Sequence, residues 1–196
     1  TSTYRADIFS NIPVWRTHKS SIHIFDIHTL EQRFFFDDFK VNTELHTAMD
    51  LIKQKISPDT TIVFPDEWAK KRFEKEFSWY NIIYCSKTRN WEKREITIHD
   101  WDVKDKNILI VDDLIQSWWT ILETAEKLKQ IWAKSVCAFA THWIFVQDSH
   151  IKLSNKLDIL YTTDTIPDNI VKSKKIDNMI VIGIQEMIMK KLFKIL

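Results

Sequence analysis

The chain contains almost no glycine, with 1 Gly among 196 residues. Average usage of about 7% would give roughly 14 glycines in a chain of this length. Glycine is the usual residue in tight turns and after helix ends, where the backbone often needs a positive φ angle. A folded domain with so little glycine must place other residue types at such positions.

Other scarce features each exclude a class of protein. The chain has 2 Cys, which excludes a disulfide framework and offers no metal-ligand spacing. No apolar run reaches the length of a membrane span and no signal peptide is visible, so we expect no membrane association and a cytoplasmic location. The formal net charge of +1 gives no reason to expect nucleic acid as a partner.

Tryptophan is as abundant as glycine is rare, with 9 Trp in the chain. Several stand where turns are expected, for example after Asn90, after Asp100 and after Ile131. Asn-Gly and Asp-Gly are turn dipeptides, and glycine commonly follows the last turn of a helix. We infer that most of these tryptophans stand for glycine, as they would if UGA codons that encode glycine had been translated as tryptophan. The alternative is a divergent protein that is rich in tryptophan.

Apolar runs alternate with amphipathic segments along the chain, which predicts a doubly wound parallel α/β sheet. The expected strands are residues 22–25, 60–64, 81–85, 108–111, 135–140, 157–161 and 179–182. The expected helices are residues 43–56, 67–77, 120–131 and 185–193, with a hairpin or loop over residues 87–102. In such a sheet, ligands bind beyond the carboxyl ends of the strands.

The segment from Asn107 to Thr120 carries the strongest functional signal. An apolar run ends in the adjacent carboxylates Asp112 and Asp113, and a short polar turn then leads into a helix. Carboxylates can accept hydrogen bonds from sugar hydroxyls, and the N–H groups of a turn and a helix start can bind a phosphate. The pattern therefore predicts a site for a phosphorylated sugar. Such a turn favours glycine, yet here it holds Trp118 and Trp119.

Polar residues also follow other expected strands, namely Asp26, His28, Asp66, Thr141 and His142. Each of them taken alone is commonly a capping or turn residue. Their shared placement favours a common site, because the carboxyl ends of parallel strands meet at the same edge of a sheet.

With glycine restored in the turn, Val111 to Thr120 resembles the phosphoribosyl-diphosphate (PRPP) signature of type I phosphoribosyltransferase folds. The whole chain is similar to the ribose-phosphate diphosphokinase (PRPP synthetase) family, and most of all to its plant-type class II members. The segments that carry the resemblance are residues 10–13, 25–36, 64–72, 86–89, 111–120 and 141–145. The resemblance implies a type I phosphoribosyltransferase-like fold.

It also implies a chain that is shortened at its N-terminus and lacks much of the ATP adenine site of the family. Residues 1–40 would be the remainder of an N-terminal phosphoribosyltransferase-like domain. Residues 41–183 would be a C-terminal domain with the ribose 5-phosphate loop, and residues 184–196 a closing helix. We expect such a fragment to be inactive alone, and the complete product to be a homo-oligomer.

The implied activity transfers the β,γ-diphosphate of ATP to the C1 hydroxyl of ribose 5-phosphate, which makes PRPP for nucleotide synthesis. Such a transfer depends on alignment and charge neutralisation more than on covalent chemistry. By resemblance, His28 and Asp66 hold a Mg²⁺ ion on the nucleotide phosphates, and Asp66, Glu67 and Trp68 bind the diphosphate. A carboxylate suits Mg²⁺ better than an imidazole does, because this ion prefers oxygen ligands.

The resemblance assigns the other site residues as well. Lys87 and Arg89 match the catalytic loop of the family, where cations would stabilise charge on the transferred group. Asp112 and Asp113 would bind the ribose hydroxyls, directly or through a second Mg²⁺ ion. The 5-phosphate would bind to the loop made of Gln116, Ser117, Trp118, Trp119 and Thr120.

Two alternative functions stay open. The first is a phosphoribosyltransferase that consumes PRPP on the same fold, although no base-recognition hood is visible in the sequence. The second is a catalytically inactive homologue that regulates or scaffolds the active enzyme. Genuine tryptophans at positions 118 and 119 would favour the inactive homologue, because they would fill the phosphate turn.

Overall fold

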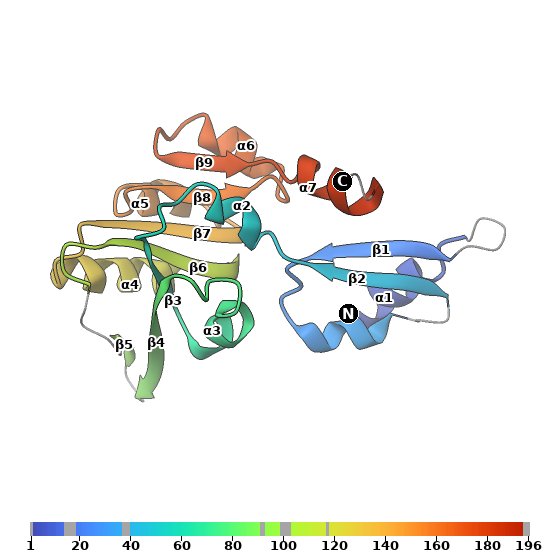
Figure 1. Cartoon of the computed structure of the whole chain (residues 1–196), viewed down its shortest axis with the longest axis horizontal. Helices are drawn as coiled ribbons and strands as arrows, with labels where there is room; N and C mark the ends of the chain where they lie inside the picture. The colour runs from blue at the N-terminus through green and yellow to red at the C-terminus, as the bar shows by residue number, and fades with distance from the viewer. Residues whose placement is uncertain are drawn as a thin grey trace. The chain divides into compact units, whose positions relative to one another are not determined.

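The structure is a computed structural model that describes residues 2–13, 19–36, 40–90, 93–98, 103–116 and 118–193. The chain divides into two compact units, Thr1–Ala48 and Met49–Leu196 (Figure 1). This division comes later than the domain boundary expected at residue 40, because strand β2 (Val41–His46) pairs with strand β1 (Ser20–Phe25) of the first unit.

The described part of the first unit contains a two-stranded parallel sheet. Helix α1 (Ser2–Ser10) packs against the 3-10 helix η1 (Leu30–Phe35). The helix predicted over residues 43–56 is wrong in its first part, which forms β2, and helix α2 covers only Met49–Lys53. Pairing with β1 supplies backbone hydrogen bonds that a local helical pattern in the sequence does not reveal.

Asp26 joins the ends of these two strands. Its backbone has a positive φ of 43°, a conformation that aspartate tolerates better than most residues. Its N–H donates to the His46 carbonyl at 2.9 Å, and its Oδ2 accepts from the Ala48 N–H at 2.9 Å. Asp26 is therefore a buried structural residue at the end of β1.

The described part of the second unit contains a seven-stranded sheet in the order β5-β4-β3-β6-β7-β8-β9 (Figure 1). Its strands are β3 (Thr61–Phe64), β4 (Asn81–Asn90), β5 (Lys93–Ile98), β6 (Asn107–Ile115), β7 (Ser135–Trp143), β8 (Leu160–Thr163) and β9 (Met179–Ile182). Neighbouring strands are parallel, except that β4 and β5 form an antiparallel hairpin. Of the hairpin or loop expected over residues 87–102, the structure shows the hairpin, although residues 91–92 and 99–102 lie outside the described residues.

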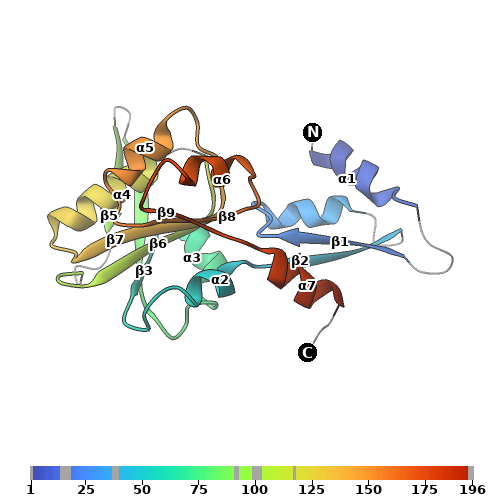
Figure 2. The same ribbon diagram turned by 90° about the horizontal axis from the view of Figure 1, so that it is seen from above.

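Helices cover both faces of this sheet. Besides α2, the described helices of the unit are α3 (Glu67–Phe73), α4 (Trp118–Gln130), α5 (Ser149–Ser154), α6 (Asp168–Ser173) and α7 (Gln185–Phe193). Helices α2 and α3 lie on one face of the sheet, and α4 and α5 lie on the other (Figure 2). Among the described residues, none of the helices combines the length and the apolar character that a bilayer span requires.

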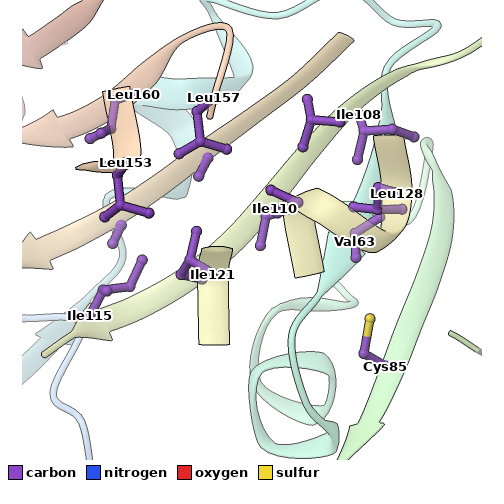
Figure 3. Close-up of a cluster of buried hydrophobic side chains, with 14 of the residues drawn as sticks. Val63, Cys85, Ile108, Ile110, Ile115, Ile121, Leu128, Leu153, Leu157 and Leu160 are labelled. Carbon is purple, nitrogen blue, oxygen red and sulfur yellow. The ribbon is translucent and has the colours of Figure 1, made fainter. Parts of the chain in front are cut away.

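The two apolar layers follow from the alternation of side chains along β6. Ile108 and Ile110 pack on the α4 side, whereas Leu109 and Val111 pack on the α2 and α3 side. Figure 3 shows Ile121 of α4 near Ile110 within the first of these layers. Burial of a side chain of this size contributes roughly 1.5–3 kcal/mol. The sheet is therefore buried on both faces, as parallel sheets generally are.

The order of the strands reverses between β3 and β6. From β3 the chain proceeds through β4 and β5 to one edge, and from β6 it proceeds through β7, β8 and β9 to the other. The fold is therefore the doubly wound α/β sheet that the sequence predicts. Its ligand site is expected beyond the carboxyl ends of β3 and β6, where the crossovers diverge.

Candidate functional site

Three carboxylates come from the two strands that flank this reversal. Val63 of β3 pairs with Ile110 of β6, so the residues that follow them lie at the same edge of the sheet. Asp66 follows β3, and Asp112 and Asp113 lie in the last part of β6. The parallel pairing thus brings together acidic residues that are far apart in the sequence.

The strand that carries the acidic pair is longer than expected. The sequence predicts a strand that ends at Val111, whereas β6 continues through Asp112 and Asp113 to Ile115. Pairing with β7 extends it, because Asp112 lies opposite Ala140 in the register of the two strands. Both residues of the acidic pair therefore lie within the strand.

Asp112 has a perturbed pKa. Burial raises the pKa of Asp112 well above its usual range, and the neighbouring charges of Asp113 and then Asp66 raise this pKa further. A hydrogen bond from the Asp113 N–H to Asp112 Oδ1, 2.9 Å long, opposes the rise. The acidic cluster of Asp66, Asp112 and Asp113 thus carries an excess of negative charge, which favours a cation or a hydroxyl donor as its ligand.

Asp113 is held in place from two directions. Arg72 of α3 donates from Nη1 to Asp113 Oδ2 at 2.7 Å, and the Leu114 N–H donates to Asp113 Oδ1 at 2.7 Å. The Arg72 and Asp113 side chains are 15% and 6% exposed. The sequence assigns no role to Arg72, because its partner lies 41 positions away and no local pattern joins them.

Asp66 lies at the junction of β3 and α3, as the sequence predicts. Its Oδ1 accepts a hydrogen bond from the Ala69 N–H at 3.0 Å, so Asp66 caps the helix. Glu67 and Trp68 form the first turn of α3, and both side chains are exposed. One oxygen of Asp66 is thus used in the cap.

The turn that follows β6 is short. Gln116 is exposed, and Ser117 lies outside the described residues. Thr120 belongs to the first turn of α4, where its carbonyl accepts a hydrogen bond from Thr124 Oγ1 at 2.8 Å. The predicted strand followed by a helix is therefore confirmed, whereas the acidic pair lies within the strand and α4 begins at Trp118 and not at Thr120.

Two indole rings occupy the start of α4. Trp118 and Trp119 stack with ring centroids 4.3 Å apart, and Lys152 Nζ lies 4.9 Å from the centroid of the Trp118 ring. Trp118 packs partly against the core, whereas Trp119 is 63% exposed. These side chains belong to the residues whose N–H groups are expected to bind the 5-phosphate.

Trp132 occupies a glycine position at the other end of the same helix. Its φ is 68°, and its side chain is exposed. The Ala133 N–H donates to the Leu128 carbonyl at 3.1 Å, and the Trp132 N–H donates to the Lys129 carbonyl at 3.2 Å. This is the Schellman pattern of helix ends, in which the left-handed residue is usually glycine.

The other predicted site residues come from β4 and from the first unit. Lys87 and Arg89 are in β4, opposite Ile96 and Arg94 of β5, and their side chains lie outside the described part of the structure. His28 follows β1 in the first unit and is exposed.

Thr141 and His142, two of the polar residues predicted at strand ends, are joined by hydrogen bonds to Thr163 and Thr165, which the sequence analysis does not name. Thr163 Oγ1 donates to the Thr141 carbonyl at 2.7 Å, and Thr165 Oγ1 donates to the same carbonyl at 2.9 Å. His142 Nδ1 lies 2.9 Å from Thr165 Oγ1. The polar run 162–165, which comes directly after an apolar segment, is the signal that could have identified Thr163 and Thr165.

Comparison with known proteins decides the family. The family described as the phosphoribosyl synthetase-associated domain matches residues 73–196, which is more than half of the chain. The chain belongs to this family. The family match includes Asp112, Asp113 and all of α4.

Plant members of the family are among the similar proteins. The chain is 40% identical over 149 residues to ribose-phosphate pyrophosphokinase 3, chloroplastic, from Oryza sativa subsp. japonica, which covers 74% of this chain and 36% of the rice protein. It is 33% identical over 177 residues to ribose-phosphate pyrophosphokinase 4 from Arabidopsis thaliana, which covers 84% of this chain and 52% of that protein. The chain therefore spans only 36% to 52% of the length of these two relatives.

The fold is also similar to that of a solved phosphoribosylpyrophosphate synthetase from Mycobacterium smegmatis. The TM-score is 0.79 at 22% sequence identity, over 99% of this chain and 63% of that chain. This similarity concerns the fold, and it confirms the predicted phosphoribosyltransferase-like fold class.

Proposed function

We propose that the complete gene product is a ribose-phosphate diphosphokinase. It transfers the β,γ-diphosphate of ATP to the C1 hydroxyl of ribose 5-phosphate, which yields PRPP and AMP. The observation that carries this proposal is the cluster of Asp66, Asp112 and Asp113 at the strand reversal, directly before α4, in a chain of this family. The names of the plant relatives give the same activity for those proteins.

Asp112 and Asp113 are the proposed ribose-binding residues. The Arg72 and Leu114 hydrogen bonds fix the Asp113 carboxylate before any ligand arrives, so little side-chain freedom is lost on binding. An ionised carboxylate accepts several hydrogen bonds, which suits the two hydroxyls of a ribose ring. Hydroxyl donors that reach Asp112 would also stabilise its ionised form, which burial and the neighbouring carboxylates disfavour.

The 5-phosphate is proposed to bind at the turn and the first turn of α4, made by Gln116, Ser117, Trp118, Trp119 and Thr120. Helix α4 has 13 residues, and its free N–H groups and dipole favour an anion at this end. Indole rings at positions 118 and 119 would obstruct a phosphate, so the proposal includes glycine at both positions. The positive φ of Trp132, which is usual for glycine at this position of a helix end, independently supports the inference that tryptophan stands for glycine in this chain.

Mg²⁺ fits the acidic cluster, because it prefers hard oxygen ligands and the single cation Arg72 pairs with only one of the three carboxylates, Asp113. Asp66 is proposed to be a ligand of one ion on the nucleotide phosphates, and His28 of the first unit is proposed as a metal ligand. Asp112 and Asp113 are proposed to hold a second ion beside the ribose. A bound Mg²⁺ ion would supply neutralisation of charge on the transferred diphosphate.

Lys87 and Arg89 are the proposed catalytic cations. They lie in β4, which pairs with β3 and so neighbours the strand reversal. Positive charge there would stabilise the charge that develops on the transferred diphosphate. Glu67 and Trp68, in the turn that begins with Asp66, are proposed to adjoin the same diphosphate, with glycine in place of the indole.

The partners and the compartment are part of the proposal as well. ATP and ribose 5-phosphate are the proposed substrates, and a homo-oligomer in the cytoplasm is the proposed form. The names of relatives from rice and spinach place those two proteins in the chloroplast and in the mitochondrion.

The test follows PRPP and AMP by phosphorus NMR, after ATP and ribose 5-phosphate are mixed with the complete product that carries glycine at positions 118 and 119. We expect both products to form only when Mg²⁺ is present. The matched control is the same protein with tryptophan at the two positions, which should be inactive. A glycine-containing protein that folds and forms neither product would overturn the proposal.

One observation favours a second function. The stacked Trp118 and Trp119 rings fill the start of α4, and if the native protein contains them, the chain is an inactive homologue that regulates or scaffolds the active enzyme. The phosphoribosyltransferase alternative is not favoured, because the family and the named relatives are those of ribose-phosphate pyrophosphokinases.

A further inference from the structure

Three metal-ligating side chains share one face of the small sheet in the first unit. In the parallel pair of β1 and β2, His23 lies opposite Glu44, and Phe25 lies opposite His46. Residues two apart in a strand point to the same face. His23, Glu44 and His46 therefore lie together, although the last two are more than twenty positions from the first.

The distances between their ligand atoms are short. His23 Nδ1 lies 2.8 Å from His46 Nε2, and Glu44 Oε2 lies 3.8 Å from each of these nitrogens. The two imidazole rings are stacked, with an interplanar angle of 8°. Each ring thus directs one nitrogen toward the other ring and toward the same carboxylate oxygen.

This triangle of atoms matches the size of a metal coordination shell. A point in its plane lies about 2.0 Å from all three corners, while zinc binds histidine nitrogen at about 2.0–2.1 Å and carboxylate oxygen at about 2.0–2.2 Å. An ion about 0.5 Å above the plane would lie about 2.1 Å from each corner, which is still within these ranges. The open side of the triangle would leave a coordination position for water.

We propose that His23, Glu44 and His46 form a binding site for a divalent transition-metal ion of the zinc class. Imidazole nitrogen suits zinc, copper and nickel, and the set of two histidines and one glutamate is typical of zinc. The His23 and His46 side chains are 16% and 7% exposed, which holds their rings in place, while Glu44 is 55% exposed and gives the ion a route from solvent.

The site uses residues that the proposed diphosphokinase chemistry does not use. The metal ligands proposed for that reaction are Asp66, His28 and the acidic pair of β6, among which oxygen ligands predominate. A zinc-class ion at the histidine pair would instead join β1 to β2. Its function is to stabilise the small sheet, since metal that binds only the folded state raises stability.

The test uses the whole chain, stripped of metal with a chelator, and titrates it with zinc chloride in a calorimeter. We expect one zinc ion per chain and a rise in Tm on zinc addition. His23→Gln and Glu44→Gln should each weaken zinc binding at least ~10-fold, since loss of a supporting residue around a zinc ligand already costs about 10–100-fold. Cobalt should give visible absorption bands in the native chain that both variants lose.

Two control variants make the result specific. Glu31→Gln removes an exposed carboxylate from η1 in the same unit and should leave zinc affinity unchanged. His28→Gln tests whether zinc binds at the proposed nucleotide metal site instead. If His23→Gln fails to fold, Glu44→Gln still decides the question, because the Glu44 side chain is more than half exposed.

Three results would each overturn the proposal: no zinc binding by the native chain, undiminished zinc binding in Glu44→Gln, or loss of zinc binding in His28→Gln alone. If the native chain binds no zinc, the 2.8 Å contact between His23 Nδ1 and His46 Nε2 would be an N–H···N hydrogen bond between the two histidines.

Discussion

Arg72 Nη1 lies 2.7 Å from Asp113 Oδ2, and this ion pair joins α3 to the acidic end of β6. Both side chains are largely buried. The pair therefore orients the carboxylate that is proposed to bind ribose, and it supplies positive charge where three carboxylates approach one another. A buried charge that loses its partner is costly, so this contact is expected to matter for stability as well as for ligand binding.

Replacement of Arg72 by methionine should reduce the free energy of unfolding by about 3–5 kcal/mol, the usual cost of breaking a buried ion pair. Methionine keeps much of the apolar stem of arginine, so the effect reports lost charge more than lost packing. Urea unfolding followed by circular dichroism measures the change. The double variant Arg72→Met/Asp113→Asn should recover part of the loss, because no unpaired charge is left.

The adjacent Lys71 provides the control for that experiment. Lys71 is 70% exposed, and its Nζ lies 4.0 Å from Glu67 Oε2, so Lys71→Ala should cost less than about 1 kcal/mol. If Lys71→Ala and Arg72→Met lower the free energy of unfolding by similar amounts, the buried ion pair has no special role in stability.

Asp112 should make the stability of the second unit depend on pH. Its pKa is raised by burial and by Asp113 and Asp66, so the folded state holds this proton more tightly than the unfolded state does. The resulting stabilisation is fully present below the unfolded pKa of about 3.9, and it is lost as the pH rises through the folded value. Asp112→Asn should therefore have a higher Tm than the native chain at neutral and alkaline pH. The rise should be about 2–4 °C for each kcal/mol gained in the free energy of unfolding.

Thermal unfolding across a pH series measures this difference. The gap between Asp112→Asn and the native chain should close toward acid pH, where the native carboxyl is protonated. Asp59→Asn, which changes an exposed aspartate, should show no such gap. A gap that widens in acid would contradict the assigned direction of the pKa shift.

Glycine at position 132 should stabilise the protein. The left-handed conformation at Trp132, with a φ of 68°, costs a residue with a β-carbon about 1–2 kcal/mol, and glycine avoids this cost. Trp132→Gly should therefore raise the Tm. Trp79→Gly is the matched control, since Trp79 is 94% exposed and does not have a positive φ, so no gain is expected there.

The inference that these tryptophans stand for glycine can be tested directly on protein from the native organism. Tryptic peptides that cover residues 107–127 and 130–134 of the native protein should contain glycine at positions 118, 119 and 132. Peptides that carry tryptophan at positions 118 and 119 would exclude the proposed phosphate turn and would favour the inactive homologue.

Arg89 and Asp113 should affect different kinetic constants of the complete, glycine-containing enzyme. Arg89 is proposed to act on the transition state, so Arg89→Ala should lower kcat by about 10²–10³, as loss of a comparable charge-stabilising donor does. Asp113 is proposed to hold the ribose in the ground state as well, so Asp113→Ala should also raise the KM for ribose 5-phosphate. Steady-state kinetics separates the two effects.

Lys104→Ala removes an exposed lysine and should leave both constants unchanged. If Arg89→Ala changes only KM, the β4–β5 hairpin is a binding element, and the catalytic role assigned to Arg89 is wrong.

Much of the second unit could be predicted from local patterns. The strand Met179–Ile182 and the helix Gln185–Phe193 have the predicted bounds, because a short apolar run and a helical period are properties of neighbouring residues. Asp66, Asp112 and Asp113 could be chosen as site residues for a related reason. They come at or near the ends of apolar runs, and parallel strands place such ends at one edge of the sheet.

Other features depended on pairing between distant segments. The segment Val41–His46 has a pattern that is compatible with a helix, and only its pairing with β1 makes it a strand. Likewise, pairing with β7 extends β6 beyond Val111 and takes the acidic pair into the strand. Backbone hydrogen bonds from a neighbouring strand outweigh the modest differences in local propensity.

The sequence by itself thus determined most of the strands of the second unit and the helices α3, α4 and α7, together with the acidic positions near strand ends and the anomaly of tryptophan at turns. Only the tertiary structure decided that Arg72 neutralises Asp113, and that His23 and His46 lie 2.8 Å apart. It also placed Trp132 in the left-handed conformation of a helix end. The physical reason is that charge pairing, metal-ligand geometry and backbone dihedral angles depend on distances in space, which the spacing of residues along the chain does not contain.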